Sequence, residues 1–256
     1  MMIYLISTAI AIAVLFLGEY FLPNETKKTY IEKGYEWNKV LVFSNSVAII
    51  AGVFSSAILV YKGTPQELNP FFLPFATTVT AYITAQSLMT DLKVLLINRY
   101  ILRVAYLAMY VISIYNIRTN DLFAGNAQAL VIFTLVLLFI FMFIPIGASD
   151  VRSLAVAMPY TLSIGGYLGI ELLIVTLLLT ALGMWIHRRK KANKELESYR
   201  ERNLEMYEEM GEKEFNKLAH KVIKFQFDND EEPAVPVGPF MIIPFLLFFL
   251  IYPFII

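Results

Sequence analysis

The stretch "ALVIFTLVLLFIFMFIPIGASDVRS", residues 129–153, decides the fold class of this chain. Residues 129–146 carry no charged side chain, and a helix of this length crosses the roughly 30 Å hydrocarbon core of a bilayer. The run ends in "GASDVRS", which places Asp150 and Arg152 where a membrane segment meets its loop. Charged groups near hydrocarbon are costly and are usually kept for a function. The stretch therefore predicts a membrane helix followed by a functional aspartate.

The overall composition extends this prediction to the whole chain. Of 256 residues, 58% are hydrophobic, with 20 Phe and 15 Tyr, and the mean hydropathy is +0.62. These values lie well above those of soluble proteins and predict an integral membrane protein. The formal net charge of +0 argues against a nucleic-acid partner, which requires a basic excess. The absence of cysteine from the sequence excludes disulfides, thiolate zinc sites and a cysteine nucleophile.

Further apolar stretches predict an all-α, polytopic membrane helical bundle with about eight membrane segments. A short apolar piece at 153–165 runs into "SIGGYLG", whose glycines suit a tight turn, so 153–187 is predicted to form a helical hairpin. The first segment has no basic start and no cleavage site, and we expect it to be retained. Besides the short piece at 153–165, the segments are predicted at 2–22, 40–61, 69–90, 96–115, 127–147, 167–187 and 237–256.

The polar region at 188–232 interrupts this pattern. It is rich in charge, and its apolar residues recur every three or four positions, which predicts one or two amphipathic helices at the membrane surface. We expect residues 1–256 to form a single integral membrane domain with this region as a cytoplasmic helical loop. His187 and His220 have no obvious metal-ligating partners, so no metal site is predicted.

The distribution of lysine and arginine predicts the orientation, because basic loops stay on the cytoplasmic side. The basic stretches at 24–39 and 187–202 should therefore lie inside the cell. Alternate crossings of the plasma membrane then leave both termini outside and bring Asp91 and Asp150 to the inner ends of two different spans. Glu19 lies near the inner end of the first span, where we expect its side chain to extend toward the headgroups.

Two carboxylates at one membrane face are suited to aspartic proteolysis. Two like charges about 3 Å apart cannot both ionise, so the pair divides into one acid and one base. The base activates a water and the acid protonates the peptide carbonyl, each step contributing about 10²- to 10⁴-fold. This chemistry needs no cofactor. Helix capping is the alternative for either aspartate taken alone.

Three motifs resemble those of the type IV prepilin peptidases and their archaeal preflagellin peptidase relatives. "GASDVRSLAVA", residues 147–157, is similar to the family's G-x-G-D signature with a basic residue two places after the Asp. "DLKVLLINRY", residues 91–100, is similar to the first catalytic stretch. "AVPVGPFMIIPFLL", residues 234–247, resembles the "PFGPF" segment that opens the family's last helix. The resemblance covers most of residues 80–256.

This resemblance implies that Asp91 and Asp150 are the catalytic pair of an aspartic endopeptidase. It implies that Gly147 permits close backbone approach, and that Pro239 and Phe240 belong to a segment packed beside the active site. The implied substrate is a membrane-inserted prepilin-like precursor, whose short basic leader precedes an apolar helix. Cleavage would occur at the cytoplasmic membrane face.

The chain departs from the family pattern at several positions. Ser149 stands where many members have a second glycine, and residues 96–98 lack the expected proline. The loop between the first two spans lacks the paired cysteines that accompany N-methylation, so cleavage without methylation is expected. Lys93 and Arg152 are expected to anchor the cytoplasmic face, with an electrostatic role beside the pair as the alternative.

Two alternatives remain open at the level of the sequence. The first is the presenilin and signal peptide peptidase group, because "PAV" at 233–235 is similar to its P-A-L motif, although no tyrosine precedes Asp91. The second is a proton-coupled membrane carrier, in which the two aspartates would be proton sites. Carriers often contain internal repeats, and no convincing repeat occurs in this sequence.

Overall fold

The computed structural model describes residues 2–20, 36–63, 69, 71–94, 99–120, 125–143, 148–219 and 238–255. Within these ranges the chain is helical and contains no strand, which confirms the all-α prediction. The chain divides into two compact units. Unit 1 comprises Met1–Leu178 and Pro236–Ile256, and unit 2 comprises Leu179–Val235, a range that includes the predicted loop at 188–232.

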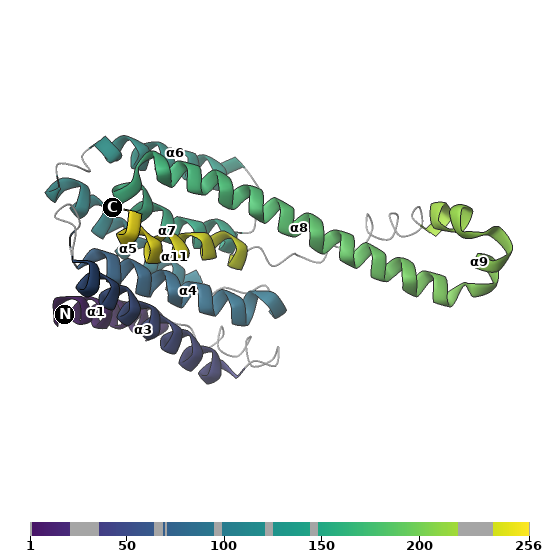
Figure 1. Ribbon diagram of the computed structural model, residues 1–256, viewed down its shortest axis with the longest axis horizontal. Helices are drawn as coiled ribbons and strands as arrows, with labels where there is room; N and C mark the ends of the chain where they lie inside the picture. Colours follow the sequence, from purple (N-terminus) through teal and green to yellow (C-terminus); the bar gives the residue numbers. More distant parts are fainter. Residues whose placement is uncertain are drawn as a thin grey trace. The chain divides into compact units, whose positions relative to one another are not determined.

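The helices of unit 1 follow the predicted apolar segments to within a few residues (Figure 1). Each forms because a long run of apolar side chains favours a backbone whose polar groups are satisfied within the segment. They are α1 (Met2–Tyr20), α3 (Trp37–Lys62), α4 (Phe72–Val94), α5 (Arg99–Thr119), α6 (Ala127–Phe143), α7 (Ala148–Gly165), the first part of α8 (Tyr167–Arg202) and α11 (Gly238–Ile255).

Gly166 joins α7 to α8. Its φ of +50° lies in the left-handed region, which glycine adopts without strain. A Cβ at this position would collide with the side chain of Asn126, whose Nδ2 donates a hydrogen bond to the Ser163 carbonyl at 3.0 Å. The predicted tight turn in "SIGGYLG" is confirmed at this residue.

Three helical stretches in the described part of the chain are long and apolar enough to cross a membrane: Met2–Tyr20, Trp37–Lys62 and Ile101–Thr119. Among the described residues, the structure therefore supports three of the predicted membrane segments and not eight. The apolar parts of the other helices are shorter, at Ala127–Val136, Leu154–Gly165, Tyr167–Gly183 and Ile242–Ile255. The sequence of α4 is less apolar because threonine, serine and glutamine recur along it.

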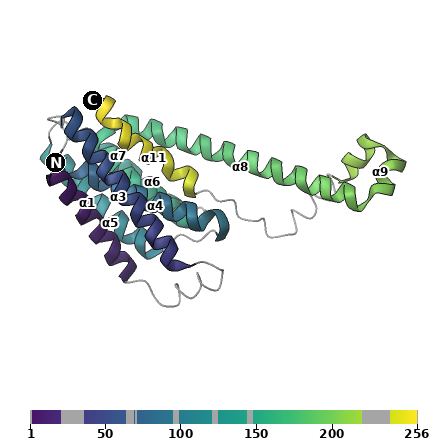
Figure 2. The ribbon, with the colours of Figure 1, turned by 60° about the horizontal axis from the view of Figure 1, so that its bottom comes forward.

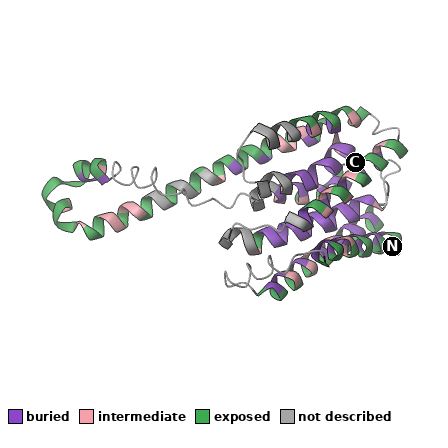
Figure 3. Cartoon of the chain, turned by 180° about the vertical axis from the view of Figure 1, so that it is seen from behind, coloured by how far each residue is buried: buried purple, intermediate pink, exposed green. Residues whose placement is uncertain are grey.

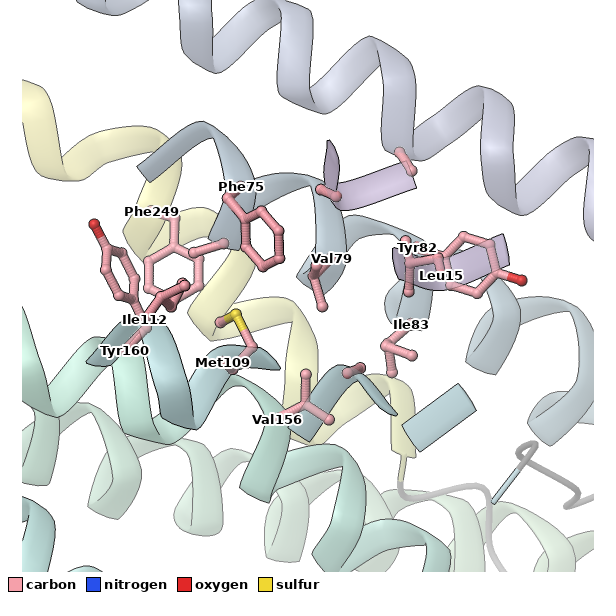
Figure 4. Packing of buried hydrophobic residues seen from close by; sticks show 14 of the residues in the cluster. Leu15, Phe75, Val79, Tyr82, Ile83, Met109, Ile112, Val156, Tyr160 and Phe249 are labelled. Atoms are coloured by element: carbon pink, nitrogen blue, oxygen red, sulfur yellow. The ribbon is translucent and has the colours of Figure 1, made fainter. Parts of the chain in front are cut away.

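Helix α4 is the centre of unit 1. Every side chain from Phe72 to Ser87 is buried, because α1, α3 and α11 pack around this helix and α5 and α7 contact it as well. Figure 2 shows these helices lying alongside one another. The core between them is continuous, and Figure 4 shows Val79 and Ile83 of α4 among residues of the neighbouring helices.

Unit 1 buries small polar side chains within its apolar core and exposes many large apolar ones, and Figure 3 shows where its buried and exposed residues lie. Small polar side chains are fully or almost fully buried, among them Ser7, Ser44, Ser55, Thr77, Thr80, Ser113, Asn116, Thr161 and Ser163. Large apolar side chains face outward, among them Phe16, Val42, Phe54, Leu107, Leu135, Leu178, Leu247 and Phe254. Small and polar residues at helix contacts with apolar residues outside are typical of helices packed in hydrocarbon.

Unit 2 is a short helical hairpin with a core of its own. The later residues of α8 are followed by α9 (Leu204–Met210) and by helical residues 212–219. Phe215 is fully buried, and its ring lies 5.7 Å from that of Tyr199 and 5.2 Å from that of Tyr207. The prediction that this region is helical is confirmed for its described residues, and its place at the membrane surface stays a prediction.

Candidate functional site

Contacts between α1 and α4 show that these two helices run in the same direction. Near the start of both, the Ser7 hydroxyl donates a hydrogen bond to the Phe71 carbonyl. Near the end of α1, the Tyr82 hydroxyl donates to the carboxylate of Glu19. Helix α4 then continues beyond the last residue of α1.

Helix α5 runs against α4. Phe72 at the start of α4 packs edge-on against Tyr115 near the end of α5, with ring centroids 5.5 Å apart. At the other end of the bundle, a Cβ on Gly18 would lie 3.2 Å from the Cα of Ile101, so the end of α1 almost touches the start of α5. Helix α5 therefore begins where α1 ends.

Helices α7 and α11 run parallel to α5. The last turns of the three helices meet, because Asn116 Nδ2 lies 3.5 Å from Ser163 Oγ and the Tyr252 hydroxyl donates to the Ile164 carbonyl at 3.0 Å. Helix α7 packs along both α5 and α11. All three helices therefore begin at the opposite end of the bundle.

We call this opposite end the aspartate end, where α1 and α4 finish and α5, α7 and α11 begin. Asp91 belongs to the last turn of α4 and Asp150 to the first turn of α7. The helix directions thus bring the backbones of both aspartates to the same end of unit 1. Their side chains lie outside the described residues, as do those of Lys93, Arg152, Pro239 and Phe240 and the whole of Gly147.

The start of α11 lies beside the start of α7. Tyr160 packs against Phe249 with ring centroids 5.6 Å apart, one turn before the contact of Tyr252 with α7. Asp150 precedes Tyr160 in α7 by as many residues as Pro239 precedes Phe249 in α11. Because the two helices are parallel, Asp150 and Pro239 lie at the same level. The segment that carries Pro239 is therefore a neighbour of the turn that carries Asp150.

The level of Asp150 along the bundle follows from the pairing of α5 with α7. Asn116 of α5 and Ser163 of α7 are in contact. Arg103 precedes Asn116 by as many residues as Asp150 precedes Ser163. Asp150 therefore lies level with Arg103, in the first turns of both helices. This level is also that of the Glu19–Tyr82 hydrogen bond, because the end of α1 meets the start of α5 there.

Asp91 lies further along the bundle axis. It follows Tyr82 in α4 by about 13 Å at 1.5 Å per residue. The register of straight helices thus separates Asp91 from Asp150 by roughly 10 to 15 Å along the axis. A shared proton requires the last turns of α4 to tilt toward α7.

Glu19 is a buried carboxylate that the sequence interpretation assigned to the membrane surface. Its residue exposure is 7%, and it accepts the hydrogen bond from Tyr82 in the central helix. The prediction that its side chain extends toward the headgroups is wrong, because α1 turns this face toward α4. Glu19 also lines a pocket of about 590 Å³ between α1 and α3 whose other walls include Phe16, Tyr20 and Trp37.

The sequence contained a signal for the burial of Glu19. Small residues lie along one face of α1, with Ser7 and Ala11 one turn apart and Gly18 two turns further on, and such a face favours close helix packing. Glu19 continues that face. An acidic residue in line with small residues is therefore predicted to point into the bundle rather than toward lipid.

The chain matches no protein-family model, no curated protein and no solved structure. Among the residues that the structure describes, no group of three or more His, Cys, Asp or Glu side chains is arranged to hold a metal ion.

Proposed function

We propose that this chain is an aspartic endopeptidase of the prepilin-peptidase type, with Asp91 and Asp150 as its acid–base pair. The observation that carries the proposal is that α4 ends and α7 begins at the same end of the bundle. The motifs around both aspartates support it independently. In the same proposal, Gly147, Pro239 and Phe240 shape the site, and Lys93 and Arg152 stand beside it.

The proposed membrane arrangement has eight segments, with the aspartate end at the cytoplasmic face of the plasma membrane. It is supported by the apolar exterior of unit 1 and by the alternating directions of its helices. The start of α1 and the end of α11 lie at the opposite end of the bundle from the aspartate end. There Lys62 lies 5.0 Å from the centre of the Phe254 ring, a position suited to the membrane–water interface.

In the proposed reaction, the ionised aspartate takes a proton from water as the oxygen attacks the peptide carbonyl. The protonated aspartate gives its proton to the carbonyl oxygen, and collapse of the tetrahedral intermediate transfers a proton to the leaving amine. The products are the basic leader and the mature apolar helix. A precursor helix in the bilayer would present its cleavage site at the aspartate end.

The activity test uses purified protein and a synthetic prepilin-type precursor. We expect Asp91→Asn and Asp150→Asn each to lower the cleavage rate by at least about 100-fold, because each removes a proton-transfer group. Glu171→Gln is the matched control, since Glu171 is exposed near the start of α8, away from the aspartate end. Cleavage by both asparagine variants at the wild-type rate would reject the proposal.

A second test asks whether the two helix ends approach each other. The sequence has no cysteine, so an Asp91→Cys, Asp150→Cys double variant carries only the two introduced thiols. A disulfide forms only when the two Cα atoms come within about 7 Å. Rapid oxidative cross-linking is expected if α4 tilts toward α7, whereas failure to cross-link with short bifunctional reagents as well would exclude a shared proton.

The burial of Glu19 favours one further candidate, a proton-coupled carrier. An ionisable group inside a membrane bundle is often a proton site, and Glu19 contacts the polar central helix. This candidate predicts proton flux in proteoliposomes that Glu19→Gln abolishes, while leaving precursor cleavage unchanged. Equal proton flux in the wild type and in Glu19→Gln would reject the carrier candidate.

A further inference from the structure

Two hydroxyl groups of α4 differ from the others. The hydroxyls of Thr77, Thr78 and Thr84 donate to backbone carbonyls one turn earlier, at 2.7 to 2.8 Å. Such local bonds satisfy a hydroxyl inside a helix bundle. Thr80 and Ser87 are equally buried, yet their oxygens have no hydrogen-bond partner within the described part of the chain.

Helix α3 contributes two more unpartnered oxygens to the same region. Ser44 Oγ and Asn45 Oδ1 are buried and lack a hydrogen bond among the residues described. The helices α3 and α4 are antiparallel, and Ser55 Oγ lies 3.4 Å from Thr77 Oγ1. Moving about three turns from this contact toward the aspartate end reaches Ser44 on α3 and Ser87 on α4, which therefore lie at the same level.

Each of these buried oxygens needs a hydrogen-bond partner. Buried polar groups almost always have hydrogen bonds, and those without a protein partner are satisfied by ordered water. Hydrocarbon cannot supply that water, so it must reach the bundle from an aqueous end. We propose that a seam along α4 at Thr80 and Ser87, with Ser44 of α3 at the level of Ser87, holds water that enters from the aspartate end.

The seam gives the proposed peptidase its second reactant. Ser87 and Asp91 are four residues apart and share one face of α4, so water at Ser87 lies one helical turn from the proposed catalytic residue. Ser87 and Thr80 are then positioning residues for the water that is consumed in hydrolysis. This role rests on the proposed function, whereas the presence of water in the seam does not.

Cysteine accessibility tests the seam directly. Ser44→Cys and Ser87→Cys are nearly isosteric, and each provides a single thiol in a sequence without cysteine. In lipid nanodiscs, a small cationic thiosulfonate reagent should modify both at least about tenfold faster than Val79→Cys, because only a hydrated thiol ionises readily. Val79 is fully buried in the apolar core on a different face of α4 and is the matched control. Equal rates at Ser87→Cys, Ser44→Cys and Val79→Cys would overturn the proposal.

Thermal unfolding provides an independent test whose sign differs between a wet and a dry seam. If Thr80 Oγ1 is hydrated, Thr80→Val removes a satisfied group and leaves its water short of a partner, so Tm should fall. If the hydroxyl is dry, the same change removes an unsatisfied buried group and Tm should rise. Thr84→Val calibrates the loss of a hydroxyl bonded to the backbone. A rise in Tm for both Thr80→Val and Ser87→Ala would overturn the proposal.

Both readouts are separate from proteolysis, because mass spectrometry and thermal unfolding require no substrate. Fast labelling of Ser87→Cys in a protein that cleaves no precursor would retain the hydrated seam and reject the peptidase. Cleavage by the wild type with no preferential labelling would retain the peptidase and reject the seam.

Discussion

Units 1 and 2 differ in what they expose. Unit 1 buries serine and threonine hydroxyls within an apolar core and exposes Phe, Leu, Ile and Val side chains over most of its helices. Unit 2 exposes glutamates and lysines along 193–217 and buries Phe215 and Ala219. The exterior of unit 1 is typical of helices packed in hydrocarbon, and the exterior of unit 2 is typical of helices in water.

The largest effect on the stability of unit 1 is expected from a bulky side chain at Gly52, where α3 contacts α1 and α4 closely. A Cβ at Gly52 of α3 would collide with the Thr78 hydroxyl and lie 2.7 Å from the Thr8 side chain. We expect Gly52→Leu to cost about 3 kcal/mol or more, because three helices must separate. The measurement is thermal unfolding in detergent.

Ala57→Leu is the control for this prediction, because Ala57 is exposed on the same helix. In a hydrocarbon environment the added side chain should be harmless. Equal destabilisation by Gly52→Leu and Ala57→Leu would mean that α3 does not pack through its small residues.

The corresponding change in unit 2 removes its buried ring. Phe215 contacts Tyr199 and Tyr207, and truncating a buried Phe to Ala costs about 3 to 5 kcal/mol in a well-packed core. We expect Phe215→Ala to cost about 3 kcal/mol, the lower limit of that range, because the core is small. The loss should unfold 203–219 locally. Hydrogen exchange should rise there and stay unchanged in α3 and α5. Leu218→Ala is the control, since Leu218 is mostly outside the core. Unchanged protection of 203–219 in Phe215→Ala would contradict the assignment of a separate core.

A smaller effect is expected from the polar contact inside unit 1. The Tyr82 hydroxyl donates to the buried Glu19 carboxylate, and hydrogen bonds to charged groups contribute about 1.5 to 3 kcal/mol. We expect Tyr82→Phe to lower stability by about 2 kcal/mol, as the ring is kept and only the donor is lost. Tyr61→Phe, at an exposed position of α3, is the control. Unchanged stability of Tyr82→Phe would show that other contacts stabilise the buried Glu19 side chain.

The smallest effect concerns the ion pair between Glu36 and Lys39 at the start of α3. The two groups are 2.7 Å apart, but their side chains are 68% and 72% exposed. Exposed pairs contribute little, so Glu36→Gln should change stability by less than about 0.5 kcal/mol. Thermal unfolding at low and at high salt checks this. A loss comparable to that of Tyr82→Phe would overturn the view that unit 1 is held together by its interior.

The sequence predicts where the helices of unit 1 lie because apolar runs are long and are separated by charge or glycine. It does not predict how far α8 continues. The predicted end at 187 is exceeded by fifteen residues, to Arg202, because the Ala-, Lys- and Glu-rich stretch favours helix and contains no glycine or proline. The apolar run marks only the part of α8 that avoids water, and the charged residues after it were predicted to form separate helices.

Side-chain direction was harder to predict. The polarity of α4 gave no sign that it is the central helix, because burial depends on how many neighbours surround a helix rather than on its own composition. Glu19 was missed because the line of small residues that precedes it in α1 was not used. The alternating directions of the helices place Asp91 and Asp150 at one end, as the positive-inside rule suggested. Their separation along the axis depends on helix register, which contacts such as that of Asn116 with Ser163 define and a sequence does not.

The place of α11 in the chain has a consequence for biogenesis. This helix packs against α4 and α7, yet the whole of unit 2 lies between it and the preceding helices in the sequence. During synthesis the faces of α4 and α7 that α11 covers stay uncovered until the ribosome has passed unit 2. A ribosome stalled within 179–235 should therefore leave a nascent chain that is sensitive to proteolysis.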